Sequence, residues 1–267
     1  MKLYRTLDEI DLRTTPCVFT FGTFDGVHVG HQHIFKAVTE IAKEKRLATA
    51  LLTFSNHPSE IISPQSAVDK LTSDAHKIAL LSSFDYVVDI AFNDVLRAID
   101  ARDFIGMLVA RINIAHMVVG EDVRFGTRGA GSATLLQTLA SEFGFICTLV
   151  PRISFQGQHI SSSRIRSHVA EARFSEVAAL LARPFSHVLP CQDSVIDLAG
   201  YACPPDGRYL VAIRTPDIKV KKEEGWKRVF VYLKERKMRI SFDGLQEMVQ
   251  EDIDRKLVEV QYLDGPL

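Results

Sequence analysis

The stretch CVFTFGTFDGVHVGHQHIF, residues 17–35, joins an apolar run to an amphipathic one through a segment rich in glycine and histidine. The run CVFTF has the length of a strand, and apolar residues recur every three or four positions in residues 33–46, as in a helix. Gly22, Gly26 and Gly30 let the backbone turn tightly and approach a ligand, while the free N–H groups of a new helix attract anions. The stretch therefore predicts a strand, a phosphate-binding loop and a helix.

The first two thirds of the chain repeat this pattern of strand followed by helix. Continuous apolar runs of strand length predict strands that are covered on both faces. Because parallel neighbours need crossover connections, the alternation predicts an α/β fold with a Rossmann-like, doubly wound parallel sheet. The predicted strands are residues 17–21, 48–54, 86–92, 115–120 and 145–150, and the predicted helices are residues 33–46, 75–82, 101–112 and 133–143.

The pattern changes after Arg183-Pro184. Short runs with partial period-two alternation, separated by turn residues, predict a small antiparallel β unit there. One helix interrupts it, with Asp243 as its N-cap. We therefore expect two domains, residues 1–183 and residues 184–267, the second a small, truncated, β-barrel-like domain. Its predicted strands are residues 208–215, 228–235, 237–242 and 257–263, and its predicted helix is residues 243–257.

The composition of the chain disfavours several classes of protein. Its 267 residues carry a formal net charge of -1, which gives no support for nucleic-acid binding. Residues 1–15 hold no apolar core of signal-peptide length, and no window approaches the roughly 20 apolar residues of a membrane helix. The four cysteines form no CxxC pair, which suits free thiols in a reducing compartment. We expect a cytoplasmic protein with neither nucleic acid nor membrane as a partner, and the sequence leaves its oligomeric state open.

His28 and His31 lie at the predicted start of the first helix. Imidazolium groups placed there can donate hydrogen bonds to phosphate oxygens beside the N–H groups of the helix. A zinc site is the alternative, but the stretch has no carboxylate or thiol spaced like a common third ligand. His33 follows Gln32 and is expected on the helix surface.

Four segments of the chain resemble one family of enzymes. They are GTFDGVHVGHQ at residues 22–32, TFSNHP at 53–58, GEDVRFG at 120–126 and SSSRIR at 161–166. In this order they are similar to the adenylyltransferase half of bacterial bifunctional riboflavin kinase/FMN adenylyltransferase, also called FAD synthetase. The HxGH pattern in the first segment also occurs in other nucleotidyltransferases, so the companion segments carry the flavin assignment.

The resemblance implies that AMP is transferred from ATP to the phosphate of FMN, with Mg2+ bound alongside ATP. His28, His31 and Arg164 are then the catalytic residues, which stabilise charge as the bonds change. The residues implied in binding the nucleotide and its phosphates are Gly22, Thr23, Phe24, Asp25, Gly26, Gly30, Asp122, Ser162, Ser163 and Arg166. Those implied in binding the flavin are Asn56, His57, Pro58, Arg124 and Phe125.

Some of these residues also have a purely structural interpretation. TFSNHP reads equally well as a strand that ends in a turn, and His57 is as readily structural as functional. Ser161 or Ser162 can cap an ordinary surface helix, although the presence of all four segments favours an anion site there. Asp25 could orient a histidine, approach the magnesium or simply fix the loop.

The resemblance weakens in the second domain, where the family carries a riboflavin kinase. Aligned on the PPDG turn at residues 204–207, the kinase Thr and Asn that contact ATP and magnesium fall on Asp193 and Val195, and its catalytic Glu falls on Phe230. The Val195 side chain can neither donate nor accept a hydrogen bond. We therefore expect an FMN adenylyltransferase without kinase activity. The alternatives are a non-catalytic flavin- or nucleotide-binding regulatory protein, and an HxGH nucleotidyltransferase for another phosphorylated acceptor.

Overall fold

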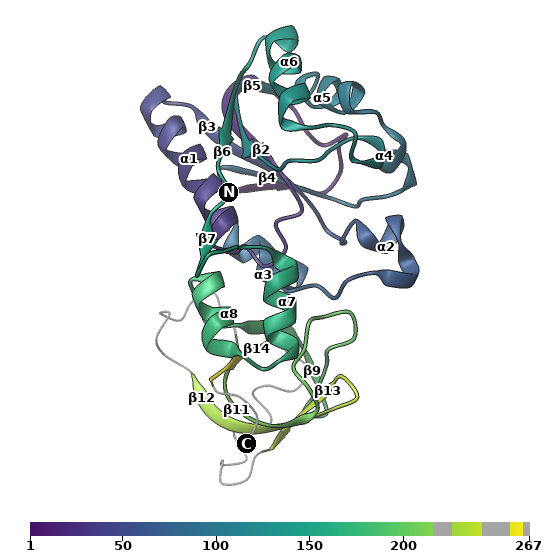
Figure 1. Ribbon diagram of the computed structural model, residues 1–267, viewed down its shortest axis with the longest axis vertical. Helices are drawn as coiled ribbons and strands as arrows, with labels where there is room; N and C mark the ends of the chain where they lie inside the picture. Colours follow the sequence, from purple (N-terminus) through teal and green to yellow (C-terminus); the bar gives the residue numbers. More distant parts are fainter. Residues whose placement is uncertain (216–225, 242–256, 264–267) are drawn as a thin grey trace. The chain divides into compact units, whose positions relative to one another are not determined.

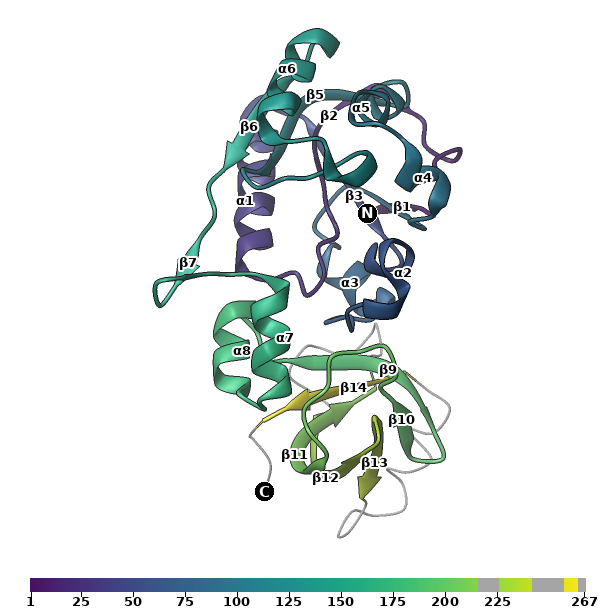
Figure 2. The same cartoon turned by 45° about the vertical axis from the view of Figure 1, so that its right-hand side comes forward.

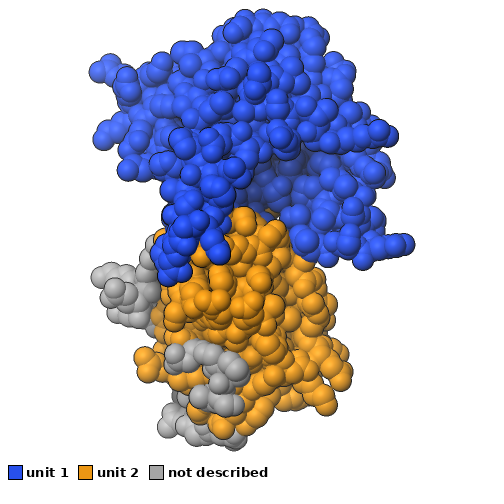
Figure 3. Space-filling model, in the orientation of Figure 1, with its two compact units in different colours: residues 1–68, 78–159 blue, residues 69–77, 160–267 orange. Residues whose placement is uncertain are grey.

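The chain folds into two compact units in the computed structural model, which describes residues 1–215, 226–241 and 257–263. Residues 1–68 and 78–159 form the first, which we name the α/β unit (Figure 3). Residues 69–77 and 160–267 form the second, which we name the barrel unit.

The α/β unit is built on a six-stranded sheet in the order β1-β4-β3-β2-β5-β6 (Figure 1). All neighbouring strands pair in parallel, which confirms the predicted parallel sheet. The strands are β1 (Lys2–Tyr4), β2 (Leu12–Phe21), β3 (Ala48–Phe54), β4 (Tyr86–Ile90), β5 (Ile112–Gly120) and β6 (Ile146–Val150). A two-stranded hairpin follows, formed by β7 (Ser154–Phe155) and β8 (Gln158–His159).

Both faces of this sheet are covered, as the continuous apolar runs predict. On one face Val18 packs in a core cluster with Val38 from the first helix. On the other face Phe19 and Phe21 pack in a larger cluster that includes Phe104. Successive residues of β2 thus point into different cores, which is why its sequence is apolar without alternation.

Each helix predicted up to residue 143 is present, although the bounds of most of them differ by a few residues. The structure adds several short helices that were not predicted. The first helix begins at Val29 rather than at residue 33, because His28 caps it. No described helix is both long enough and apolar enough to cross a membrane. The helices up to residue 143 are α1 (Val29–Lys45), α2 (Ser59–Ile62), α3 (Asp74–Leu80), α4 (Asp94–Ala98), α5 (Ala101–Val109) and α6 (Ala133–Phe143), with 3-10 turns at Pro64–Ser66 and Thr127–Gly129.

The barrel unit contains a closed barrel of antiparallel strands in the order β10-β13-β12-β11-β14-β9 (Figure 2). Tyr209, Val211 and Val231 are completely buried in it, while Arg208 and Tyr232 are exposed, so the strands alternate as predicted. The strands are β9 (Ser186–Gln192), β10 (Val195–Asp197), β11 (Gly207–Arg214), β12 (Lys227–Lys234), β13 (Lys237–Ser241) and β14 (Leu257–Tyr262). The predicted helix at 243–257 falls almost entirely on residues outside the described part of the chain.

Two helices, α7 (Ser162–Ala170) and α8 (Phe174–Leu181), also belong to the barrel unit. Phe174 stacks on Tyr262 of β14 with ring centroids 4.7 Å apart. The compact unit therefore begins before the expected domain boundary at residue 184. The extent of the catalytic domain to residue 183 stays a prediction, because packing and function need not divide the chain at one point.

Candidate active site

Three of the four segments leave the carboxyl edge of the sheet at adjacent strands. β3, β2 and β5 are neighbours, and they lead into the TFSNHP, HxGH and GEDVRFG segments respectively. The chain proceeds from β2 to β3 on one side and crosses to β5 on the other, so the strand order reverses at β2. Parallel α/β sheets bind ligands at such a reversal. The α/β unit therefore brings these three segments together where a ligand is expected.

The loop after β2 has a strained and firmly held backbone. Phe24 and Val27 have φ values of 48° and 41°. A positive φ is unusual for a β-branched residue and costs about 1 to 3 kcal/mol, so the surroundings must impose it. Thr53 Oγ1 donates to the Thr23 carbonyl at 3.0 Å, and Gln32 Nε2 donates to the Val27 carbonyl at 2.9 Å. These bonds hold the loop in shape before any ligand binds.

The two histidines of the HxGH pattern stack on each other at the start of α1. Their ring centroids lie 3.6 Å apart, with 16° between the ring planes. His28 is the N-cap, and its Nδ1 accepts a hydrogen bond from the His31 N–H at 3.3 Å. A Cβ atom at Gly30 would lie 3.1 Å from the His28 ring. The glycine therefore leaves room for the capping ring, and the spacing places both imidazoles at the helix start.

The surroundings of His31 favour its neutral form near neutral pH. Burial, with a smaller contribution from the charge of His28, holds the pKa of His31 well below its usual value. Its Nδ1 is buried and has no hydrogen-bond partner among the described residues. The edge-on ring of Phe24 lies beside it, with centroids 5.2 Å apart. The imidazolium expected from the sequence thus requires an approaching anion, which raises the pKa.

The GEDVRFG segment has an exposed polar part and a buried aromatic part. Asp122 and Arg124 are exposed. Phe125 is buried and packs edge-on against Phe21, with ring centroids 5.6 Å apart. Its ring therefore lies in the core of the α/β unit, and its expected contact with the flavin stays a prediction.

Gly126→Ala is expected to lower the free energy of unfolding by about 3 kcal/mol, which combines backbone strain with steric overlap. Gly126 has φ 69°, and a Cβ atom there would lie 2.5 Å from the backbone nitrogen of Ala101. Gly144→Ala is the matched control, because Gly144 has φ 78° but no atom within 4 Å of the added Cβ. It should lose only about 1 kcal/mol, the left-handed strain alone. Urea titration of both variants measures the difference, and equal losses would contradict the steric explanation.

Hydrogen bonds join the TFSNHP segment to the loop after β4. Asn56 Oδ1 accepts from the Phe92 N–H at 2.7 Å, and Asn56 Nδ2 donates to the Phe92 carbonyl at 3.0 Å. His57 Nδ1 lies 2.8 Å from Ser59 Oγ, and His57 and Pro58 are both partly exposed. Asn56 thus has a structural role, and the flavin contacts of all three predicted residues stay predictions.

The fourth segment belongs to the barrel unit, whereas the histidines belong to the α/β unit. Ser161 caps α7, since its Oγ accepts from the Arg164 N–H at 3.2 Å, which confirms the predicted cap. Arg166 Nε donates to the Asp69 carbonyl at 2.7 Å. The expected binding of ATP phosphates by Ser162, Ser163 and the two arginines stays a prediction.

A parallel sheet with paired histidines at the first helix after its topological reversal defines the HxGH class of nucleotidyltransferase. The sequence model of the FAD synthetase family matches residues 11–164, and the chain belongs to this family. It is 31% identical over 190 residues to the bifunctional riboflavin kinase/FMN adenylyltransferase of Escherichia coli K12, covering 70% of this chain and 61% of that protein. The Bacillus subtilis protein of the same name is 31% identical over 173 residues, or 63% of this chain and 54% of that protein.

The chain thus spans about 60% of the length of the curated relatives it matches. A solved structure titled as a macrolide-efflux protein from Streptococcus pneumoniae covers 98% of both chains with a TM-score of 0.79. Its sequence identity is 22%, so this likeness concerns the fold.

Proposed function

We propose that the protein is an FMN adenylyltransferase, which transfers AMP from ATP to FMN and releases pyrophosphate. The observation that carries this proposal is the stacked pair His28 and His31 at the start of α1, in a chain of the FAD synthetase family. The strained loop before them supplies a preorganised backbone for the phosphates.

In the proposed reaction, a phosphate oxygen of FMN attacks the α-phosphorus of ATP. The bond from that phosphorus to the bridging oxygen breaks, and pyrophosphate leaves with the electron pair. The FMN phosphate is already anionic, so no general base is needed. Catalysis then depends on aligning the attacking phosphate with the α-phosphorus. It also depends on stabilising the charge that develops on that phosphorus centre and on the leaving pyrophosphate. We assign the α-phosphate to His28 and His31. The leaving phosphates are assigned to Arg164 together with Ser162 or Ser163.

We further propose that Mg2+ accompanies ATP. This hard cation binds phosphate oxygens together with one or two carboxylates and keeps several of its waters. Asp25 is a buried carboxylate within the phosphate loop, so its donor type fits the cation. When bound, the ion would neutralise phosphate charge while the histidines act on the α-phosphate.

The segments assigned to the nucleotide and the flavin lie on both sides of the histidines. Asp122 and Arg124 follow β5, whereas His57 follows β3, and these strands flank β2. We propose that Asp122 contacts the nucleotide. The flavin is then contacted by residues of both segments, namely Asn56, His57, Pro58, Arg124 and Phe125. The phosphates of both substrates then meet over β2.

The four cysteines support a cytoplasmic location for this reaction. All four are free, and burial raises the pKa of the Cys17 thiol to about 12. Unpaired thiols are typical of a reducing compartment.

Purified protein is expected to form no FMN from riboflavin and ATP. Asp193 and Ser194, with φ 49° and 60°, form a two-residue turn that joins β9 directly to β10 at the position of the family's kinase motif. Phe230 stands at the position of the catalytic Glu. The guanidinium carbon of Arg208 lies 3.9 Å from the centroid of the Phe230 ring. This geometry supports the loss of the kinase residues that contact ATP and magnesium and of the catalytic Glu. Conversion of riboflavin to FMN in a chromatographic assay would overturn the proposed loss.

Pyrophosphate release from ATP, measured with FMN and with other phosphorylated acceptors, tests the proposed function. Release that depends on FMN supports it. Release with a different acceptor alone would indicate another HxGH nucleotidyltransferase. Binding of FMN without release would indicate a regulatory flavin-binding protein.

A further inference from the structure

The outward side of β12, in the barrel unit, carries only aromatic and cationic side chains. Val229, Val231 and Leu233 are buried inside the barrel, so the alternate residues of the strand point outward. The same alternation continues to the residue just before the strand. The outward residues are Trp226, Arg228, Phe230, Tyr232 and Lys234. The strand thus presents a stripe of rings and positive charges.

Both neighbouring strands add cations to this stripe. Arg208 of β11 stands directly opposite Tyr232, and Arg239 of β13 stands opposite Tyr232 on the other side. Because directly opposite residues have Cβ atoms about 5 Å apart, the Tyr232 ring, which is 46% exposed, lies between two arginines. The outward residues of the stripe, together with Arg208, Lys237 and Arg239, form what we name the basic-aromatic face.

The positive charge of the basic-aromatic face is not neutralised within the described part of the chain. Its cations are exposed, and none of them forms a salt bridge with a described residue. They are Arg208, Arg228, Lys234, Lys237 and Arg239. Lys234 stands directly opposite Lys237, and like charges so placed disfavour strand pairing. Asp197 stands on the other side of Lys237, where its carboxylate accepts from the Ala199 N–H at 2.9 Å.

Arginine side chains stack on the rings of this face. The guanidinium carbon of Arg208 lies 3.9 Å from the centroid of the Phe230 ring and 5.6 Å from that of the Tyr232 ring. The guanidinium carbon of Arg214 lies 4.5 Å from the centroid of the Trp226 ring. These contacts stabilise the sheet, and they also fix planar groups in place before any ligand arrives. A planar ligand then loses less affinity to the ordering of side chains.

Cations and planar groups together match an unpaired nucleic-acid strand. Cations bind its phosphates, and its bases stack on aromatic rings and on guanidinium planes. An acidic peptide would match only the charges, and a duplex keeps the faces of its bases covered. Loops and ends of RNA present unpaired bases. We propose that the basic-aromatic face binds single-stranded RNA.

This proposal departs from the expectation, drawn from composition, that the protein has no nucleic-acid partner. That expectation rests on a formal net charge of -1, which averages over the whole chain. Binding depends instead on the charge of one surface. The proposal is also independent of the proposed transfer of AMP to FMN, so either can fail alone.

The fluorescence of Trp226, the single tryptophan of the chain, measures binding on the face itself. Single-stranded RNA of about 12 nucleotides should quench it, and the affinity should fall as salt rises. The same sequence as duplex RNA, and a polyglutamate peptide, should each bind about tenfold more weakly or worse, because neither offers free bases. Equal binding of either one would overturn the proposal. Tighter binding of single-stranded DNA of the same sequence would overturn the choice of RNA.

Substitutions at Tyr232 separate stacking from charge. Tyr232→Ala should weaken RNA binding about tenfold, because it removes a ring on which a base stacks. Tyr232→Phe keeps the ring and should bind within about twofold of the unaltered chain. Thermal unfolding checks that both variants remain folded. Equal affinities of the Ala and Phe variants would show that the ring serves the sheet alone and would overturn the proposal.

Arg239→Glu tests the contribution of charge. It should weaken RNA binding about tenfold and make the slope of log affinity against log salt shallower by about 0.7, the contribution of one phosphate contact. Arg13→Glu is the matched control, because Arg13 is exposed on β2 of the α/β unit and the exchange alters the net charge equally. Its affinity should equal that of the unaltered chain. Equal effects of the two substitutions would show that net charge alone acts, and would contradict a site on this face.

Discussion

His31→Ala is expected to reduce the rate of FAD formation by about two to three orders of magnitude, with the fold intact. Removing one donor aimed at developing charge typically costs about 3 to 4 kcal/mol of transition-state stabilisation. His31 can act as such a donor because it lies at the start of α1 and is partly exposed. Its ring is held against that of His28, with ring centroids 3.6 Å apart. Its lowered pKa keeps the free ring neutral, so the charge arises only with the substrate.

Two control variants separate chemistry from folding at this helix. His33→Ala should keep near-normal turnover, because His33 is exposed on the surface of α1. His28→Asn removes the ring but supplies a good N-cap. We therefore expect it to lose activity by a similar factor while retaining its thermal stability. Near-normal kcat in His31→Ala would remove the histidine pair from the mechanism.

The barrel unit is expected to lose stability steeply as the pH falls from about 6.5 to about 4. Burial lowers the pKa of both His76 and His187 to about 4, with smaller contributions from Arg183 and Arg214 at His76 and from His76 at His187. In this window the unfolded chain binds protons that the folded chain excludes, so stability falls as the pH falls. Each histidine contributes a loss of about 3 kcal/mol across the full window.

Urea unfolding followed by tryptophan fluorescence measures this loss. Trp226 is the single tryptophan of the chain and belongs to the barrel unit, so its signal reports that unit. His187 Nε2 lies 2.9 Å from the Ala202 carbonyl, a bond that Gln can reproduce in part. The His187→Gln variant should therefore show about half the pH dependence. A midpoint that does not change between pH 6.5 and 4.5 would show that neither histidine is buried as described.

The sequence predicted the α/β sheet well because strands covered on both faces are apolar throughout. β3 and α6 have the bounds predicted for them, residues 48–54 and 133–143. β1 was not predicted, because it has three residues and only Tyr4 among them is buried. β9 was also missed, and it contains Pro190, a residue that argues against a strand.

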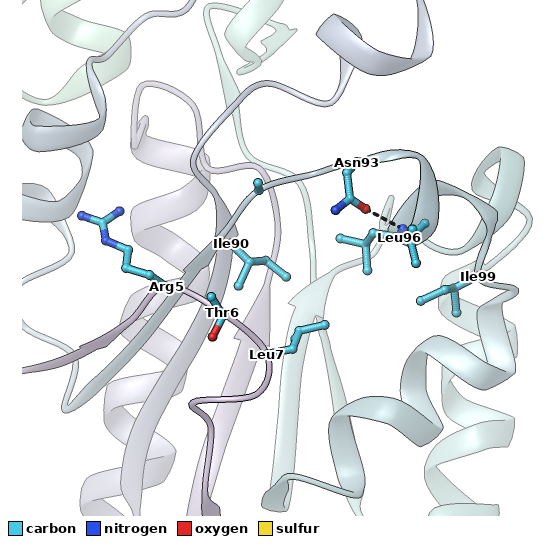
Figure 4. Close-up of a pocket in the computed structure, with 9 residues that line it drawn as sticks. Arg5, Thr6, Leu7, Ile90, Asn93, Leu96 and Ile99 are labelled. Carbon is cyan, nitrogen blue, oxygen red and sulfur yellow. Dashed lines mark hydrogen bonds between the residues drawn. The ribbon is translucent and has the colours of Figure 1, made fainter.

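The arrangement of the candidate site could be predicted only in part. The glycines and histidines of the HxGH loop are visible as a local pattern, and Thr53, a buried hydroxyl at the end of an apolar strand, is a weaker local signal. The core position of Phe125 and the bond from Asn56 to Phe92 depend on contacts between distant parts of the chain. A cavity lined by Leu7 and Ile90 (Figure 4) has the same origin, because it forms between the ends of β1 and β4, which pair across more than 80 residues of sequence.

The conversion of FMN and ATP to FAD by the purified protein tests the central claim most directly. Chromatography of the flavins, with pyrophosphate measured in the same samples, follows both products. We predict that FAD and pyrophosphate accumulate in equal amounts, and that His31→Ala nearly abolishes both. Binding of FMN and ATP with neither product formed would contradict the account.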